Sequence, residues 1–413
     1  MIQMVQLSSV AKFALENPSS IREIMTVVTD YKLHPEKYPR ELIYLGGGWP
    51  QDNPPAVLKE AIMKVLNDKE KFTVSVRYGA TRGIPEFIDA IANYEEKIIG
   101  RKISKDQIIV GLGSTDLTSA LLKVILDEGD EIIITSPGYL NYKRQIEIET
   151  NMKVKVKYWS IIEGEEFKPK IEELYDLIGN KTKALILTSP GNPDGQIFDQ
   201  QMYKSIVEVA SEKSIILILD QAYRMFTYEL DPEYLHSPPS ENEVHICTFS
   251  KELRIPGWRV GYLIADEELV RAVETVEQAR NLTPASLQQE ILATLLLDNA
   301  YLNKIRSFYE KGRKLYKDVA DETYNLLRRE IPIFIPIKPM GGFYIFFNHQ
   351  RFMQSSKIFC KKLLEEMQIA LAPGLDFGLE GWTRLSFAPL VLETSKIREG
   401  IERIKKFVEI APL

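Results

Sequence analysis

Short apolar runs alternate along the chain with stretches whose apolar residues repeat at helical spacing. Runs rich in β-branched residues predict strands, because such side chains pack well on a pleated sheet. The expected strands lie at about 107–110, 131–135, 153–159, 184–187, 214–219, 244–247 and 259–264. The helices expected between them cover about 54–69, 84–99, 116–126, 139–149, 169–178 and 199–212. Strands separated by helices predict a mostly parallel sheet that is covered by helices on both faces.

The pattern changes in the last third of the chain, where strands and helices no longer alternate regularly. The elements expected there are helices at 267–280, 286–324, 355–366 and 394–408 and strands at 334–337, 342–347 and 383–387. This mixture is typical of a smaller α+β domain. Near the N-terminus the pattern predicts one helix over 8–29 and a strand over 41–45. We therefore expect an N-terminal segment (1–50) packed on the small domain, a large domain (51–290) and a small C-terminal domain (291–413).

Composition narrows the class of protein. The 413 residues are 45% hydrophobic and 27% charged, which is usual for a soluble globular protein. The net charge of −6 argues against a nucleic-acid-binding surface, and no apolar run approaches the roughly 18 residues that a membrane span needs. Cys247 and Cys360 cannot build a disulfide framework, and no metal-ligand spacing connects them to the histidines. We expect a cytoplasmic protein that binds no metal, membrane or nucleic acid.

Residues 248–261, TFSKELRIPGWRVG, concentrate the candidate chemistry. Hydroxyl groups precede the amine of Lys251, and the guanidinium of Arg259 follows it among small residues. A lysine that attacks a carbonyl needs such a setting, since an anion clamp beside it can hold the phosphate of a carbonyl-bearing cofactor. The alternative interpretation is an exposed lysine at the start of a helix, with ordinary surface charges around it.

Other polar residues follow the expected strands, and ligands bind at the carboxyl ends of strands in such sheets. A strand, a glycine-rich turn at 111–115 and a helix form the arrangement that directs free N–H groups at a phosphate. The strand ends offer the amine of Lys251, the carboxylate of Asp220 and the aromatic face of Tyr139. Asn192 and Tyr223 add two hydrogen-bond donors, and an anion nest is formed by Ser114, Thr115, Thr248 and Arg259. Pyridoxal 5′-phosphate (PLP) needs all of these, because its aldehyde, ring nitrogen, O3′, ring face and phosphate each require a partner.

The chain resembles the class I/II aminotransferases among the fold-type-I PLP enzymes, over about residues 41–388. The resemblance rests on motifs that occur in the family's order: Tyr78-Gly79, Gly113-Ser114-Thr115, Pro137-Gly138-Tyr139, Pro190-Gly191-Asn192-Pro193, Asp220-Gln221-Ala222-Tyr223, Ser250-Lys251 with Arg259, and Trp382-Thr383-Arg384-Leu385-Ser386-Phe387. It implies an α/β fold, with a mostly parallel, seven-stranded type of sheet in the large domain and a smaller α+β domain. It also implies a homodimer that moves an amino group between an L-amino acid and a 2-oxo acid, with 2-oxoglutarate and glutamate as one pair.

The resemblance implies roles for the residues of these motifs. Lys251 would form the internal aldimine and then act as base and acid in the proton shift at the substrate Cα. Asp220 would pair with the ring nitrogen, Asn192 and Tyr223 would hydrogen-bond O3′, and Tyr139 would stack on the ring. The alternatives are a helix N-cap for Asp220 and a core aromatic for Tyr139.

The resemblance also implies a phosphate site. Ser114, Thr115, Thr248 and Arg259 would hold the phosphate, and Tyr78 would reach it from the neighbouring subunit. The family often has serine where this chain has Thr248, a departure that keeps the hydroxyl. An ordinary loop tyrosine is the alternative for Tyr78.

The resemblance implies fewer of the substrate-binding residues than of the cofactor-binding residues. Arg384 would bind the substrate α-carboxylate, because a guanidinium presents a bidentate fork to a carboxylate, and the amide of Gly48 would add a contact; an exposed strand arginine is the alternative. For a second, distal carboxylate Arg280 and Arg22 are conceivable partners, although both also fit as surface charges. Trp49 would either line the side-chain pocket and favour apolar or aromatic substrates, or pack on the small domain.

Two other functions fit part of the pattern. A PLP-dependent lyase or synthase of the cystathionine or aminocyclopropane-carboxylate type shares the fold and the same residues. A non-catalytic PLP-fold binding protein would be suggested by a fused DNA-binding module or a lost lysine, and the sequence has neither.

Overall fold

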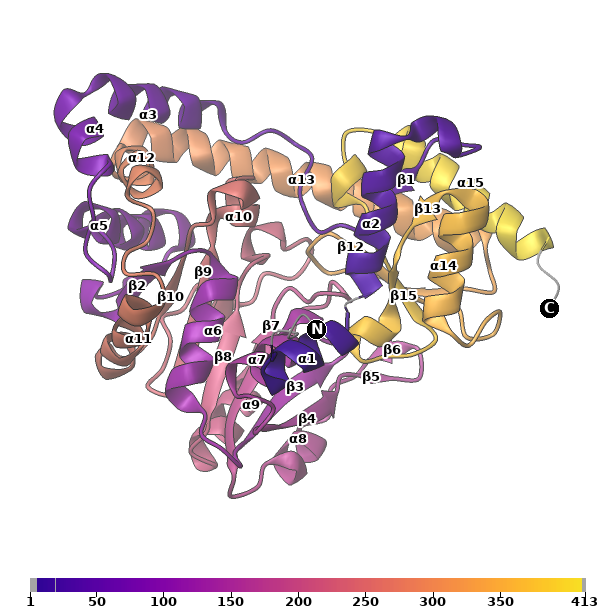
Figure 1. Cartoon of the computed structure of the whole chain (residues 1–413), viewed down its shortest axis with the longest axis horizontal. Helices are drawn as coiled ribbons and strands as arrows, with labels where there is room; N and C mark the ends of the chain where they lie inside the picture. Colours follow the sequence, from indigo (N-terminus) through magenta and orange to yellow (C-terminus); the bar gives the residue numbers. More distant parts are fainter. Residues whose placement is uncertain (1–5, 19, 411–413) are drawn as a thin grey trace, which may run out of the picture.

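The computed structural model describes residues 6–18 and 20–410 and contains a seven-stranded sheet (Figure 1). The strand order is β2-β10-β9-β8-β7-β3-β4, and every pair is parallel except the two made by β10. The strands are β2 (Ile108–Gly111), β3 (Glu131–Ser136), β4 (Lys155–Ser160), β7 (Thr182–Thr188), β8 (Ile216–Asp220), β9 (Glu243–Thr248) and β10 (Gly261–Ile264). The mostly parallel sheet predicted from the apolar runs is confirmed.

Helices cover both faces of this sheet because successive strand residues point to opposite sides. Ile132 and Ile134 pack with one helix layer, whereas Ile133 between them packs with the other. The first layer contains α6 (Ser114–Ile125), α7 (Asn141–Glu149) and α11 (Glu267–Arg280), and the second contains α8 (Ile171–Leu177) and α9 (Gln200–Glu212). A further cluster at the β2–β10 edge joins α3 (Ala56–Asn67), α5 (Pro85–Tyr94) and α12 (Ser286–Leu297).

A second, antiparallel sheet lies in the C-terminal part of the chain. Its order is β11-β12-β15-β14, with β11 (Ile335–Ile337), β12 (Tyr344–Asn348), β14 (Ala372–Pro373) and β15 (Trp382–Ser386). Helices α14 (Ser356–Met367) and α15 (Thr394–Ile410) pack with this sheet in one core. The N-terminal segment joins this part, since β1 (Ile43–Tyr44) pairs with β13 (Ile369–Ala370) and α2 (Ser20–Leu33) packs on α14.

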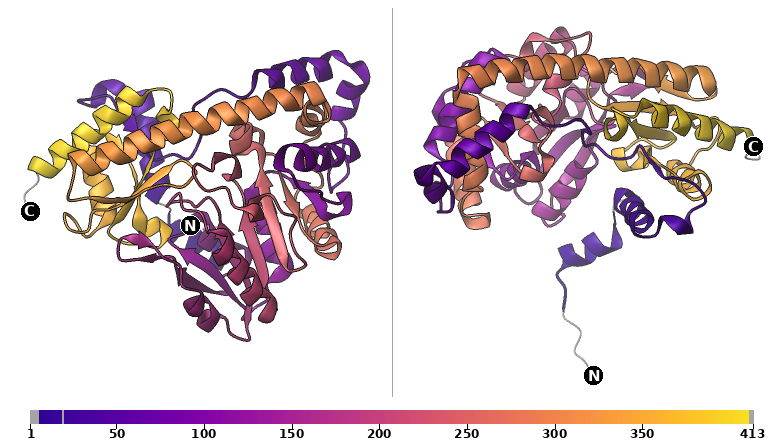
Figure 2. Two further views of the ribbon diagram at one scale, coloured as in Figure 1. Left: turned by 180° about the vertical axis from the view of Figure 1, so that it is seen from behind. Right: turned by 90° about the horizontal axis from the view of Figure 1, so that it is seen from above.

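Helix α13 (Asn299–Glu330) crosses between the two sheets (Figures 1 and 2). Its N-terminal half, with Tyr301 and Tyr309, packs in the core beside α3 and α5. Its C-terminal half, with Tyr316 and Leu327, packs in the core of the antiparallel sheet. One rigid helix therefore belongs to both hydrophobic cores and holds them at a defined separation.

Several predicted boundaries were wrong. The single helix expected over 8–29 is two helices, α1 (Ser9–Glu16) and α2, because Pro18 disfavours the helical conformation of the residue before it. The stretch 286–324 divides into α12 and α13, since the Asp298 side chain caps a new helix by accepting from the amides of Ala300 and Tyr301. Helix α4 (Lys69–Ser75) and the hairpin of β5 (Ile162–Glu163) and β6 (Glu166–Phe167) were not predicted.

Candidate active site

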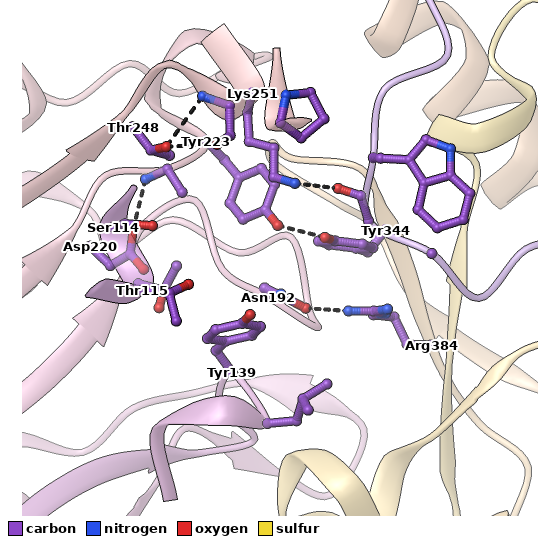
Figure 3. A pocket seen from close by; sticks show the side chains of 18 of the residues that line it. Ser114, Thr115, Tyr139, Asn192, Asp220, Tyr223, Thr248, Lys251, Tyr344 and Arg384 are labelled. Carbon is purple, nitrogen blue, oxygen red and sulfur yellow. Dashed lines mark hydrogen bonds between the residues drawn. The ribbon is translucent and has the colours of Figure 1, made fainter. Parts of the chain in front are cut away.

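A cavity of about 470 Å³ opens at the carboxyl ends of the parallel strands, between the two sheets (Figure 3). Residues from both sheets and from the N-terminal segment line it: Met25, Tyr44, Gly46, Gly47, Gly48, Trp49, Ser114, Thr115, Tyr139, Leu140, Thr188, Asn192, Asp220, Ala222, Tyr223, Thr248, Ser250, Lys251, Pro256, Arg259, Tyr344 and Arg384. Every site residue predicted from the sequence is among them except Tyr78. The sheet topology brings them together because parallel strands end at one edge.

Lys251 projects into this cavity from α10 (Phe249–Glu252), which begins directly after β9. The Thr248 hydroxyl caps the helix by accepting from the Ser250 amide at 3.2 Å. The Lys251 amine donates to the carbonyl oxygen of Gly48 at 2.7 Å. Burial, helped by the positive charges of Arg259 and Arg384, lowers the pKa of Lys251 to about 8. About a tenth of the amine is therefore neutral, and so nucleophilic, at pH 7, far more than for a lysine with an unshifted pKa.

Asp220 ends β8 on the floor of the cavity and is buried. The Tyr142 hydroxyl donates to its Oδ2 at 2.7 Å, and the Ala222 amide donates to its Oδ1 at 2.9 Å. Burial raises the pKa of Asp220, while these two donors and the charge of Lys251 oppose the rise. A carboxylate held in this way is oriented to accept a further proton donor, such as a protonated ring nitrogen.

Two buried polar pairs connect the parallel sheet with the antiparallel one. The hydroxyls of Tyr223 and Tyr344 are 2.5 Å apart, and Arg384 Nη1 donates to Asn192 Oδ1 at 2.8 Å (Figure 3). Asn192 follows β7 and Tyr223 follows β8, whereas Tyr344 and Arg384 belong to β12 and β15. The cavity is thus closed from both sides by side chains that contact one another across it.

Arg384 is buried in β15 and still has hydrogen-bonding capacity. Its Nη2 donates to the Gly46 carbonyl oxygen at 2.6 Å, and its guanidinium carbon lies 4.4 Å and 4.7 Å from the ring centroids of Tyr344 and Phe377. Its Nε has no hydrogen-bond partner among the described residues. A buried guanidinium with an open donor, held between two rings, is suited to bind a carboxylate.

The other end of the cavity offers an anion site. Ser114 and Thr115 open α6 after Gly113, whose positive φ of 88° suits glycine, and free N–H groups at a helix start attract anions. A Cβ on Gly113 would lie 2.7 Å from Arg259 Nη2, so glycine also makes room for the guanidinium. The Thr248 hydroxyl lies on the same side of the cavity, which completes the set of groups that can hold a phosphate.

These groups fit PLP by the chemistry of the donor set. The cavity combines a depressed-pKa amine, a buried carboxylate, an aromatic ring and an anion site, from Lys251, Asp220, Tyr139 and the start of α6. A PLP molecule accounts for the presence of an amine, a carboxylate and a positively charged anion site in one cavity. The described residues contain no group of three or more His, Cys, Asp or Glu side chains that could hold a metal ion.

Three predicted residues are placed in ways that the sequence could not show. Tyr78 lies away from the cavity, with 83% of its surface exposed in the single chain. Trp49 lines the cavity and stacks on Tyr44, with 4.9 Å between ring centroids and 21° between planes. Gly48 contacts Lys251 through its carbonyl oxygen.

Sequence reasoning missed several residues of the site. Tyr344 lines the cavity and Tyr142 supports Asp220 from behind, while Met25, Tyr44 and Leu140 add apolar surface. Alternation along β12 places Tyr344 on the face of Arg384, although no motif marks it in the sequence. No local signal marks Met25, because it reaches the cavity from α2, and the packing of that helix is not recorded in the neighbouring residues.

A buried ionic network lies behind the cavity. Arg224 donates to Glu252 at 2.7 Å and to Glu95 at 2.9 Å, while Arg101 pairs with Glu95 and donates to Gln221 Oε1 at 3.0 Å. All five side chains are buried. Two carboxylates and two guanidinium groups balance in charge, which offsets part of the desolvation cost of placing them there.

The fold and the cavity define a fold-type-I PLP enzyme. The chain belongs to the class I and II aminotransferases, since the model of that family matches residues 40–404. It is 31% identical to the asparagine–oxo-acid transaminase of Streptococcus mutans, over 90% of this chain and 92% of that protein. It is also 31% identical to the aspartate aminotransferase of Bacillus subtilis, over 89% of this chain and 92% of the relative.

Solved structures agree with this assignment. The aspartate aminotransferase of Thermus thermophilus with maleate superimposes with a TM-score of 0.84 at 25% identity, covering 98% of this chain and all of that one. An aromatic aminotransferase of Pyrococcus horikoshii superimposes with a TM-score of 0.80 at 26% identity, covering 92% and 98%. The protein is a PLP-dependent aminotransferase that acts on amino and 2-oxo acids, as its motifs predicted.

Proposed function

We propose that the protein uses this cavity to transfer an amino group from an L-amino acid to a 2-oxo acid, and that Lys251 moves the proton of the substrate Cα. Bound PLP supplies an electron sink for the negative charge that develops at the substrate Cα. The Lys251 amine, with a pKa of about 8, would accept the proton that leaves the substrate Cα and would hold it on Nζ for the later return. The observation that carries this proposal is that amine, placed in one cavity with Asp220 and Arg384.

We assign the cofactor's contacts on the same basis. The buried Asp220 carboxylate would hold the ring nitrogen in its protonated form, with Tyr142 orienting it. Tyr223 and Asn192 would donate to O3′, and Tyr139 would cover the ring face. Ser114, Thr115, Thr248 and Arg259 would hold the phosphate, which is supported by their position around the start of α6.

The substrate α-carboxylate would bind Arg384. The open Nε of Arg384 supports this role, and a carboxylate arriving there would compete with Asn192 and Gly46 for the other donors. The amide of Gly48, in the loop between β1 and α3, would add a second contact to the same α-carboxylate. The carbonyl oxygen of Gly48 accepts from the Lys251 amine. Release of Lys251 from Gly48 would then accompany the binding of PLP.

We further propose a homodimer in which Tyr78 reaches the phosphate site of the partner. Tyr78 is highly exposed, and exposed apolar side chains lie close to it in sequence on α3, α4 and the loop that follows: Met63, Leu66, Phe72, Val74 and Val76. Covering apolar surface of this kind is the usual driving force of a stable subunit contact.

The cellular location, the domain division and the amino acceptor are proposed from the sequence. We propose a cytoplasmic location, which fits two buried, unpaired cysteines, and the division into residues 1–50, 51–290 and 291–413. None of the helices in the described part of the chain has the length and apolar character of a membrane span. The expected acceptor, 2-oxoglutarate, rests on family resemblance.

An absorbance spectrum of the purified protein tests the function. We expect a visible band that disappears when one amino acid is added and returns when a 2-oxo acid is added. A band that shifts without this reversible exchange would favour the lyase or synthase alternative instead. A protein that shows no band after incubation with PLP would contradict the cofactor assignment.

A further inference from the structure

We propose that the amino donor of this enzyme is an L-amino acid with an uncharged apolar or aromatic side chain. The proposal rests on the proposed function, because it uses Arg384 and Lys251 to place the substrate. It goes beyond that function in naming the chemistry of the side-chain site, which the names of the aspartate aminotransferases among the relatives would not suggest.

The side-chain site follows from the two ends of the substrate. Gly46 contacts Arg384 and Gly48 contacts Lys251, so one short loop runs past the groups that would hold the α-carboxylate and face Cα. Tyr44 and Trp49 flank this loop and both line the cavity. A side chain attached at Cα therefore extends toward the surface that these two rings form.

This surface is apolar. Met25, Tyr44 and Trp49 form a continuous wall, in which the two rings stack and the Tyr44 hydroxyl donates to the Met25 sulfur at 3.1 Å. Burial raises the pKa of Tyr44 to about 12, so the wall stays uncharged. Leu140, at the start of α7, adds a further apolar side chain to the lining.

The wall is a built feature of the loop. A Cβ on Gly47 would lie 2.3 Å from Trp49 Cζ3 and 2.6 Å from Tyr44 Cε1, so only glycine at this position allows the stacked pair. The stack fixes both rings against the cavity although Trp49 is 38% exposed. Rigid aromatic surface of this kind favours apolar and aromatic ligands, because binding buries apolar area at little cost in ordering.

Each described positively charged residue of the cavity already has a proposed role. Among the described residues that line it, only Lys251, Arg259 and Arg384 carry a positive charge, and they serve the amine, phosphate and α-carboxylate positions. Arg280 lies outside the cavity and pairs with Asp116 at 3.5 Å and Glu149 at 3.8 Å. The side chain of Arg22, the other candidate, is outside the described residues. Among the described residues of one chain, a second carboxylate against the wall would find no cationic partner, and its desolvation would be costly.

The half-reaction with single amino acids tests the proposal directly. The rate at which the visible band disappears is measured for phenylalanine, leucine and aspartate with the PLP-loaded protein. We expect phenylalanine and leucine to react with at least tenfold higher kcat/KM than aspartate. Equal or faster reaction with aspartate would overturn the side-chain proposal while leaving aminotransferase function intact. If no amino acid changed the band, the proposed function would fail and this inference with it.

A binding measurement avoids any dependence on turnover. The affinities of 3-phenylpropanoate and succinate, a monocarboxylate and a dicarboxylate, are compared by calorimetry with the PLP-loaded protein. We expect 3-phenylpropanoate to bind at least tenfold more tightly. Tighter binding of succinate would show that the cavity provides a cation for the second carboxylate and would overturn the proposal.

A matched pair of variants locates the site. Met25→Lys places an ammonium group in the wall and should improve succinate binding and the reaction with aspartate while weakening those of 3-phenylpropanoate and phenylalanine. Leu33→Lys adds the same charge to the same helix at a position that is 69% exposed and should change neither preference. Equal effects of the two substitutions, or no effect of Met25→Lys on the preference, would place the side-chain site elsewhere.

Discussion

Arg224 donates through Nε to Glu252 Oε1 at 2.7 Å, and this buried pair joins the residue after Tyr223 to the residue after Lys251. Tyr223 and Lys251 face the cavity, whereas their neighbours point away from it into the ionic network. The two catalytic segments are thus tied together from behind by one ion pair. The relative position of the amine and the cofactor-binding residues therefore depends on groups that never touch the substrate.

Arg224→Met should destabilise the protein by about 3–5 kcal/mol, because it leaves Glu252 and Glu95 buried with one cationic partner fewer. The free energy of unfolding from denaturant titration measures this. Arg271→Met is the control, since Arg271 pairs with Glu267 on an exposed helix surface and its loss should cost less than about 1 kcal/mol. Equal losses in the two variants would mean that the buried network adds nothing to stability.

Lys251→Ala should abolish both amino-group transfer and the visible band, because no other described lysine lines the cavity. The fold should remain, since the side chain makes a single hydrogen bond, to Gly48. Absorbance and circular dichroism report the two properties separately. Lys204→Ala, an exposed substitution on α9, should leave both unchanged. A band that survived in Lys251→Ala would show that another amine binds the cofactor.

Arg384→Ala should raise KM for every amino acid alike, by roughly 10- to 100-fold, if a charged hydrogen-bonded pair worth about 1.5–3 kcal/mol is lost. The increase should be uniform because the α-carboxylate is common to all substrates. Arg351→Ala, at an exposed arginine paired with Glu165, serves as the control. A KM that rose for one amino acid and not for the others would assign Arg384 to the side-chain site instead.

The rate of PLP uptake by cofactor-free protein should rise with pH and level off above about pH 8. Burial and the charges of Arg259 and Arg384 hold the pKa of Lys251 at about 8, and only its neutral form has the lone pair that attacks the aldehyde. Below this pH the rate should fall about tenfold per pH unit. The rate of appearance of the visible band gives the profile, and Arg384→Ala should move its midpoint upward. A midpoint near the ordinary lysine pKa of 10.5 would contradict the depressed value.

Tyr78→Ala should weaken PLP binding several-fold while leaving the protein dimeric. The side chain is 83% exposed in the single chain, so its contribution depends on the partner's site. Sedimentation gives the oligomeric state and equilibrium dialysis gives the affinity for PLP. Tyr158→Ala, at another exposed tyrosine, should change neither. A monomeric wild-type protein with full PLP affinity would remove the basis for a shared site.

Much of the site could be predicted because its residues follow local signals. Strands of alternating or continuous apolar residues end at Asp220 or a few residues before Asn192 and Lys251, and the order of these strands along the chain is preserved in the sheet. The boundaries were less certain, because a single proline or a capping aspartate decides where a helix ends. Pro18 and Asp298 each divided a helix that the periodicity alone made continuous.

The sequence by itself determined the alternation of strands and helices, the chemistry at the strand ends and the family, since all three are carried by neighbouring residues. Only the tertiary structure decided which distant side chains meet. Tyr223 and Tyr344 are 121 positions apart and contact through their hydroxyls, and the apolar wall joins Met25 to Tyr44 and Trp49. Such contacts depend on how two sheets and an N-terminal helix pack, and packing responds to the shape of the whole chain, which no local pattern records.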